Sequence, residues 1–136
     1  MQDRYLFRAK RLDNGQWVQG FICKKKYKSN KFYISCFHDK DDNEQFFAID
    51  PDTICQCTGL KDKNGKLIWE NDIMVAHLDE DYPEDETYIR ILWCGNGFCS
   101  IENGSKDIAQ IEKFDREHFE VCGNIFDNPE LLESEE

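Results

Sequence analysis

Apolar and polar residues alternate in short runs along this chain, and turn-forming residues separate the runs. The alternating segments are 5–11, 17–23, 31–37, 45–49, 53–58, 72–78, 88–93, 98–101 and 119–123, with a short apolar run at 67–69. Each segment has the length of a strand, and Gly, Asn, Asp or Pro follows most of them. The pattern predicts a mainly β protein (β-rich α+β) built of short antiparallel strands.

The turns are clearest between residues 50 and 75. Thr53 to Thr58 reads as a strand that Gly59 ends, and Asn64-Gly65 is a tight-turn signal. Because such turns need φ > 0, we expect a positive φ at Gly59, Asn64 and Gly65. Asn71 precedes another strand in a second polar turn, and Asn also tolerates φ > 0.

The order of elements after residue 72 resembles that of a small SH3-like barrel: strand, long loop, strand, tight turn, strand. Ser105–Phe119 is the best helix candidate, because Ser105 can cap it and Ile108, Ile111 and Phe114 recur three residues apart. We therefore predict one short helix near the C-terminal third.

The length of the chain fits a single unit, 1–136, or two subdomains, with an N-terminal β part at 1–58 and a small-barrel part at 59–136.

The charge is strongly acidic, with a formal net charge of −11 at pH 7. Binding to nucleic acid rests largely on neutralising phosphates, so a chain with this net charge is not expected to bind nucleic acid. There is no signal peptide and no apolar run of membrane length. Together with seven cysteines, an odd number, this predicts a cytoplasmic protein whose thiols are reduced and mostly buried.

Four groups of residues are candidate sites, and for each we favour a structural interpretation. Cys55 and Cys57 could begin a zinc site, but no second cysteine pair has the matching spacing. The acidic loop Asp79–Glu86 lacks the glycine and spacing of a calcium loop. The basic segment Lys24–Lys31 with Tyr27 and Tyr33 could contact nucleic acid, although a solvated hairpin loop is the simpler interpretation. The three tryptophans are expected to be core anchors.

No Ser-His-Asp or Cys-His arrangement occurs at local spacing, and no glycine-rich phosphate loop is present. We therefore expect no catalytic residue, no bound cofactor and no metal site. The aromatic strands have edges, and unpaired edges favour association, so we expect a homo-oligomer; the strands around Phe46-Phe47 and Phe98 are the unprotected ones.

The motifs resemble one known family. Five segments are similar to the signature of the YopX-like family of phage and prophage proteins: Phe7-Arg8-Ala9, Asp50-Pro51-Asp52-Thr53, the run from Gln56 to Lys66 (QCTGLKDKNGK), Asn71-Asp72-Ile73, and the run from Val121 to Leu132 (VCGNIFDNPELL). Two positions depart from it, since Tyr or Phe is expected at Cys57 and Gly at Asn71. The resemblance implies phage or prophage origin and a β-rich subunit, and it supplies no reaction.

The leading hypothesis is a non-enzymatic accessory protein that acts by self-association or by binding another macromolecule, with a protein as the expected partner. An acidic mimic of DNA that blocks a DNA-binding protein and an uncharacterised enzyme are the alternatives.

Overall fold

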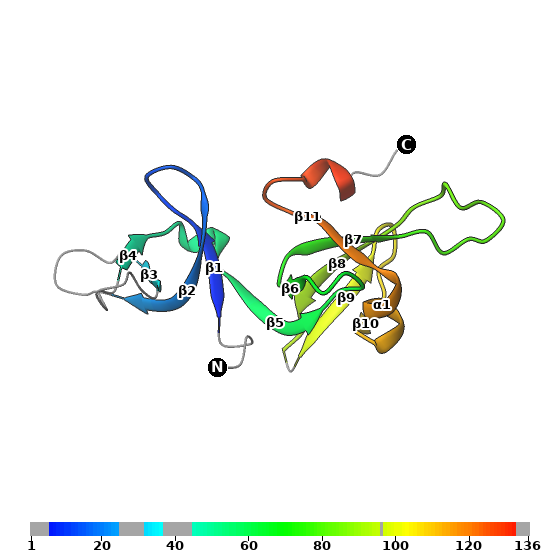
Figure 1. Cartoon of the computed structure of the whole chain (residues 1–136), viewed down its shortest axis with the longest axis horizontal. Coiled ribbons are helices and arrows are strands. Elements are labelled where there is room, and N and C mark those ends of the chain that lie inside the picture. Colours follow the sequence, from blue (N-terminus) through cyan, green and yellow to red (C-terminus); the bar gives the residue numbers. More distant parts are fainter. Residues whose placement is uncertain (1–5, 25–31, 37–44, 96, 133–136) are drawn as a thin grey trace. The chain divides into compact units, whose positions relative to one another are not determined.

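The described part of the chain forms two antiparallel sheets, one short α-helix and two single turns of 3-10 helix (Figure 1). The computed structural model describes residues 6–24, 32–36, 45–95 and 97–132. Its elements are β1 (Phe7–Lys10), β2 (Trp17–Lys24), β3 (Phe32–Cys36), β4 (Gln45–Ala48), η2 (Pro51–Thr53), β5 (Cys55–Lys61), β6 (Leu67–Trp69), β7 (Asp72–Ala76), β8 (Thr87–Trp93), β9 (Phe98–Glu102), β10 (Ile108–Gln110), α1 (Lys113–His118), β11 (Glu120–Asn124) and η3 (Pro129–Leu132). The prediction of a strand-rich chain with one short helix is confirmed.

The chain divides into two compact units, residues 1–57 and residues 58–136, and β5 runs through the division. In unit 1 the strand order is β4-β3-β2-β1-β5, every neighbour being antiparallel. Its core gathers around three fully buried side chains, Ala9, Ile34 and Ile49. The predicted hairpin at Asp13-Asn14-Gly15 joins β1 to β2, with Gly15 at φ 71° and its N–H donating to the carbonyl of Arg11 (2.9 Å).

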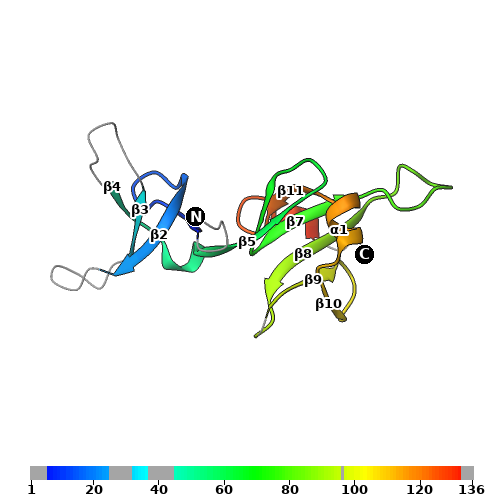
Figure 2. The same cartoon turned by 60° about the horizontal axis from the view of Figure 1, so that its bottom comes forward.

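Unit 2 contains the second sheet, in the order β10-β9-β8-β7-β11. β7 to β10 form a meander, α1 follows, and β11 returns to pair with β7. The strand, long loop, strand, tight turn and strand predicted after residue 72 correspond to β7, β8 and β9 with their connections. The succession of β7, β8 and β9 can be followed in Figure 2. The core of the unit consists of six buried residues: Ile68, Met74, Ala76, Ile89, Ile91 and Phe119.

One buried carboxylate ties a turn of unit 2 to its last strand. Asp62 is 6% exposed, and its Oδ1 accepts hydrogen bonds from the N–H groups of Asn64 and Lys66, both at 2.9 Å. Its Oδ2 accepts from the N–H of Val121 in β11, which is 59 residues away in the chain, at 2.8 Å. Polar backbone groups from two distant segments are thereby satisfied by one side chain.

The turn that follows Asp62 differs from the prediction at one residue. Gly59 and Gly65 have φ of 79° and 80°, as expected, whereas Asn64 does not have a positive φ. The carbonyl of Asp62 accepts from the N–H of Gly65 (3.0 Å), so only Gly65, after the turn, needs the left-handed conformation. Asn71 has φ 70°, so asparagine does replace glycine in the second turn. Gly59 does not end its strand either, because β5 continues through it to Lys61.

The predicted helix Ser105–Phe119 is wrong over its first half. Ser105 does accept a hydrogen bond from the N–H of Asp107 (3.0 Å), but this forms a local turn. Residues 108–110 then pair with 101–99 of β9, and the helix begins only after Glu112. Pairing with β9 satisfies the backbone of this segment. Of the three apolar residues in the predicted stripe, only Ile111 packs against the core, whereas Ile108 is 55% exposed and Phe114 is 49% exposed.

Candidate functional site

The cysteine pair singled out by the sequence lies in the interior. Cys55 and Cys57 are fully buried on one face of β5, and the Cys55 thiol donates to the carbonyl of Thr53 at 3.3 Å. Within the described residues, no three His, Cys, Asp or Glu side chains gather closely enough to hold a metal ion. The two thiols therefore pack as small apolar groups in the described structure.

The other sequence candidates do not converge on a site. In the acidic loop, Asp79 accepts hydrogen bonds from the N–H groups of Asp81 and Tyr82 (2.9 and 3.2 Å), so it organises its own backbone. The basic segment 25–31 lies outside the described residues. Trp69 is buried as expected, but Trp93 is 48% exposed and meets Phe98 edge-on at 5.0 Å, so the prediction of a core role is wrong for Trp93.

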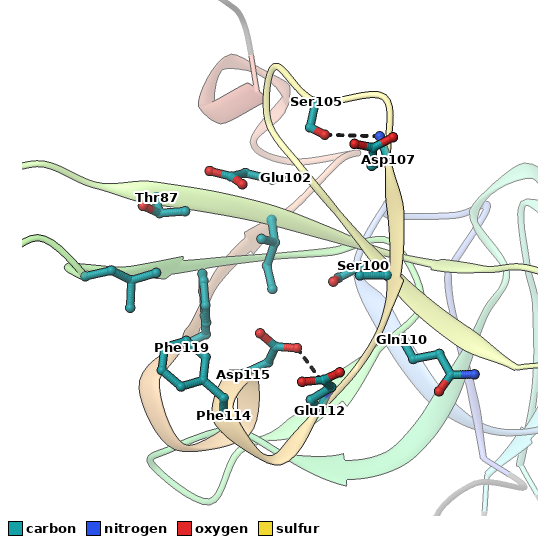
Figure 3. A pocket seen from close by; sticks show the side chains of 13 residues that line it. Thr87, Ser100, Glu102, Ser105, Asp107, Gln110, Glu112, Phe114, Asp115 and Phe119 are labelled. Carbon is teal, nitrogen blue, oxygen red and sulfur yellow. Dashed lines mark hydrogen bonds between the residues drawn. The ribbon is translucent and has the colours of Figure 1, made fainter.

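A cavity of about 470 Å³ opens in unit 2 between the strands and the helix, and Figure 3 shows its lining. Ile89 of β8 (5% exposed) and Phe119 (3% exposed) form its apolar wall, to which the partly exposed Leu78 and Phe114 also contribute. Ser100 of β9, 7% exposed, presents its hydroxyl toward the middle of the cavity. The cavity therefore joins an apolar wall to a buried hydroxyl group.

Four carboxylates lie around this cavity on two sides. Glu102 ends β9 and Asp107 precedes β10, whereas Glu112 and Asp115 come from the start of α1 (Figure 3). One oxygen of Asp115 accepts from the N–H of Glu112 at 2.9 Å, which fixes that carboxylate at the helix start. None of the 13 lining residues is Lys, Arg or His, so negative charge is not neutralised within the lining.

The charge of the protein is concentrated in the unit that holds the cavity. Residues 58–136 contain 20 Asp and Glu against 7 Lys and Arg, a net charge of −13. Residues 1–57 contain 8 against 10, a net charge of +2. A concave surface lined by one sign of charge concentrates counter-charged ligands, so this arrangement favours a cationic guest.

Sequence reasoning missed these four carboxylates because they are scattered over residues 102–115. The four side chains lie around one cavity because β10 pairs with β9 and α1 follows β10 directly in the chain. The difference in charge between the two halves of the chain was the available signal, and it identifies the unit but not the cavity.

Comparison with known proteins places the chain in a family. The family described as "YopX protein" matches residues 6–133. The chain belongs to the YopX family. A crystal structure of protein EF1440 from Enterococcus faecalis is similar to this YopX family member, with 25% sequence identity and a TM-score of 0.55 over 93% of this chain and 96% of that one. A search among curated proteins finds no match.

Across the part of the chain that the structure covers, this YopX family member has no helix of the length and apolar character that spanning a membrane requires.

The thiols of this YopX family member are expected to react in a definite order. Cys55, Cys57 and Cys99 are buried, Cys94 is partly exposed and Cys122 is exposed, so the expectation of burial is wrong for Cys122. Partial loss of hydration raises the pKa of the Cys122 thiol, and the carboxylates of Glu120, Glu86 and Asp72 raise it further. Among the five thiols whose exposure the structure describes, we expect Cys122 to be labelled first in the native protein, more slowly than free cysteine at neutral pH.

Thiol labelling followed by mass spectrometry at several times measures this order. The side chains of Cys23 and Cys36 lie outside the described residues, so Cys122→Ser serves as the control that identifies the first phase. Labelling of Cys55 or Cys57 before Cys122 would contradict the burial described above.

Tyr88 provides a prediction about pH. Its hydroxyl donates to the carboxylate of Glu86, and this bond, followed by partial burial and the Glu86 charge, raises the Tyr88 pKa to about 12. The folded-state pKa exceeds the ordinary value of 10.0, so this contact stabilises the fold below that value and the contribution is lost as pH rises toward 12.

The absorbance of phenolate against pH, compared between the wild type and Tyr88→Phe, isolates the titration of this tyrosine. Glu86→Gln should return its pKa toward 10, and Glu84→Gln should leave it unchanged. A Tyr88 that titrates near pH 10 in the wild type would show that the hydrogen bond does not form in solution.

Proposed function

We propose that this YopX family member acts by binding and not by catalysis, and that unit 2 docks a basic protein partner over its acidic cavity. The observation that carries the proposal is the set of four carboxylates around the cavity, without a cation in the lining, in a unit of net charge −13. The proposal includes the phage or prophage origin and cytoplasmic location that the resemblance and the sequence imply.

Charge complementarity argues for a basic protein as the partner. Opposite charges across an interface steer association and disfavour partners of the same sign, so nucleic acid and anionic membranes are poor ligands for unit 2. The partly exposed apolar groups Leu78 and Phe114 beside the cavity supply surface whose burial favours binding. A docked partner would therefore present basic groups to the carboxylates of the cavity and aliphatic surface to its apolar wall.

Mimicry of DNA is the special case in which the docked surface is the partner's own DNA-binding surface. The 20 acidic residues of unit 2 support DNA mimicry as a second candidate function. It predicts that duplex DNA competes with the YopX protein for the partner, whereas a partner bound through another basic surface remains able to bind DNA.

Two labelled 12-residue peptides test the proposal, one alternating Arg with Gly and Ser, the other carrying Glu in place of Arg. Fluorescence anisotropy with the full chain should show binding of the Arg peptide alone, weakened by salt between about 0.05 and 0.5 M because exposed charges are screened. Failure of the Arg peptide to bind, or equal binding of both peptides, would overturn the proposal.

A matched pair of triple variants then locates the binding surface. Glu102→Gln, Asp107→Asn and Glu112→Gln together remove three charges at the cavity. Glu80→Gln, Glu84→Gln and Asp85→Asn together remove three charges from the loop between β7 and β8, none of which lines the cavity. We expect the cavity variant to bind the Arg peptide at least about tenfold more weakly and the loop variant to change little; equal losses would assign binding to diffuse charge.

Self-association is part of the same proposal. β4 lies at the edge of its sheet, as expected for the strand carrying Phe46, and Phe46 is 38% exposed. Phe98 is not on an edge, because β9 lies between β8 and β10 and the edge strand is β10. Edge pairing through β4 predicts a closed homo-oligomer.

Light scattering at micromolar concentration measures the mass of the oligomer. Phe46→Lys should shift the mass toward the 16.1 kDa monomer, and Tyr82→Lys, at an exposed aromatic residue in the β7–β8 loop, should not. A wild-type protein that stays monomeric on concentration would contradict self-association and leave the docking proposal unaffected.

A further inference from the structure

The cavity of unit 2 contains a polar side chain to which the described residues offer no hydrogen-bond partner. Ser100 is 7% exposed, and among the described residues nothing forms a hydrogen bond with its hydroxyl. Figure 3 shows this hydroxyl directed into the cavity. The hydroxyl opens onto the cavity, so a guest that displaces water from it must offer a hydrogen bond in return.

The carboxylates restrict the guest to a cation with several donors. Glu102 and Asp107 lie on one side of the cavity and Asp115 on the other (Figure 3). The Oδ2 of Asp115 is engaged by the N–H of Glu112, which leaves Oδ1 available. None of these carboxylates forms an ion pair with another described residue. A single cation placed between the two sides would meet carboxylates from both.

The apolar wall requires that the cation stand on an aliphatic stem. Ile89 and Phe119 are buried at the cavity and cannot hydrate a charged head, but they can pack against methylene groups. Arginine combines such a stem with a planar guanidinium whose five N–H groups can point in several directions at once. The ammonium of lysine has three donors around one nitrogen and cannot span the two sides in the same way.

We propose that the cavity receives one arginine side chain of the basic partner. The aliphatic stem lies against Ile89 and Phe119, one edge of the guanidinium donates to Ser100, and the remaining N–H groups face Asp115 and the Glu102–Asp107 side. This inference rests on the proposed docking function, since it names the residue by which the partner is recognised. The 470 Å³ of the cavity accommodates one such side chain with accompanying water.

The test uses the blocked tripeptides Gly-Arg-Gly, Gly-Lys-Gly and Gly-citrulline-Gly, the last being uncharged and nearly the same shape as the first. Amide chemical shifts of the isotope-labelled full chain report binding and its place. We expect Gly-Arg-Gly to bind in the millimolar range, typical of so small a ligand, with shifts concentrated at Ser100, Glu102, Asp107 and Asp115. Compared with Gly-Arg-Gly, Gly-citrulline-Gly should bind at least about tenfold more weakly and Gly-Lys-Gly severalfold more weakly.

Variants connect binding to the groups invoked. Ser100→Ala and Glu102→Gln should each weaken Gly-Arg-Gly binding by about fivefold to tenfold. Ser35→Ala, which alters a buried serine of unit 1, is the matched control and should leave affinity unchanged. Glu102 is on the surface, so Glu102→Gln keeps the test decisive if Ser100→Ala alters the fold.

The outcomes separate the two proposals. If the 12-residue Arg peptide binds at the cavity but arginine and citrulline tripeptides bind equally, the arginine inference is overturned and the docking function stands. If neither the 12-residue peptide nor the tripeptide binds, both are overturned. Agmatine, which carries the same guanidinium without a peptide, serves as a further arm; binding at least tenfold tighter than Gly-Arg-Gly would reassign the cavity to a small amine.

Discussion

Asp62→Ala is expected to lower the free energy of unfolding by about 2–4 kcal/mol. The substitution removes the acceptor of three backbone N–H groups, those of Asn64, Lys66 and Val121. Water can reach the turn and replace part of what is lost at Asn64 and Lys66, which are exposed residues. The N–H of Val121 is partly buried, so water replaces its lost acceptor less readily, and the bond from Asn64 to Glu120 remains as a link between the turn and β11.

Urea denaturation of the purified variants measures this loss. Asp79→Ala is the matched control, since Asp79 also accepts two backbone N–H groups but does so in an exposed loop. Asp79→Ala should lower the free energy of unfolding by less than about 1 kcal/mol, because solvent replaces the lost acceptor. Equal destabilisation by the two substitutions would show that the link between Asp62 and Val121 contributes nothing.

Gly20→Ala is expected to have the second large effect, about 3 kcal/mol or more. A Cβ at Gly20 would lie 2.1 Å from the carbonyl oxygen of Ser35 and 2.8 Å from Cγ2 of Ile34. The first of these contacts is with backbone, so neighbouring strands would have to separate, and overpacking of this kind disrupts the core around Ile34.

Gly97→Ala is the control, because a Cβ there has no neighbour within 4 Å and its φ is not in the left-handed region. Thermal unfolding should therefore show a large drop in Tm for Gly20→Ala and little change for Gly97→Ala. A Gly20→Ala protein with an unchanged Tm would mean that β2 and β3 do not approach one another this closely.

Local signals in the sequence were sufficient for the strands and most turns. Alternation at residues 88–93 and Asn-Gly at residues 14–15 and 64–65 correspond to β8 and to turns with a left-handed glycine. These features depend on neighbours within a few positions, and such neighbours are visible in a single sequence.

Features made by distant residues could not be predicted. The pairing of β10 with β9 converted half of an expected helix into a strand, and the same pairing brought Glu102 and Asp107 to one side of the cavity. Ser100 has no distinctive signal in the sequence, since a serine within an alternating strand resembles any other polar position. Its burial beside the cavity results from packing of β8, β9 and α1.

The hydrogen-bonded hairpin turns also bear on how the purified protein ages. Asparagine followed by glycine deamidates when the glycine nitrogen attacks the asparagine side chain, and that nitrogen must be free to move. The N–H of Gly15 and the N–H of Gly65 are held by the carbonyls of Arg11 and Asp62, so attack there requires local opening of the turn. The side-chain amide of Asn64 is in addition bound to Glu120 at 2.8 Å. In stored samples, therefore, isoaspartate at Asn64 would report how often this turn opens, and the loss of the Asp62 carboxylate should accelerate its formation.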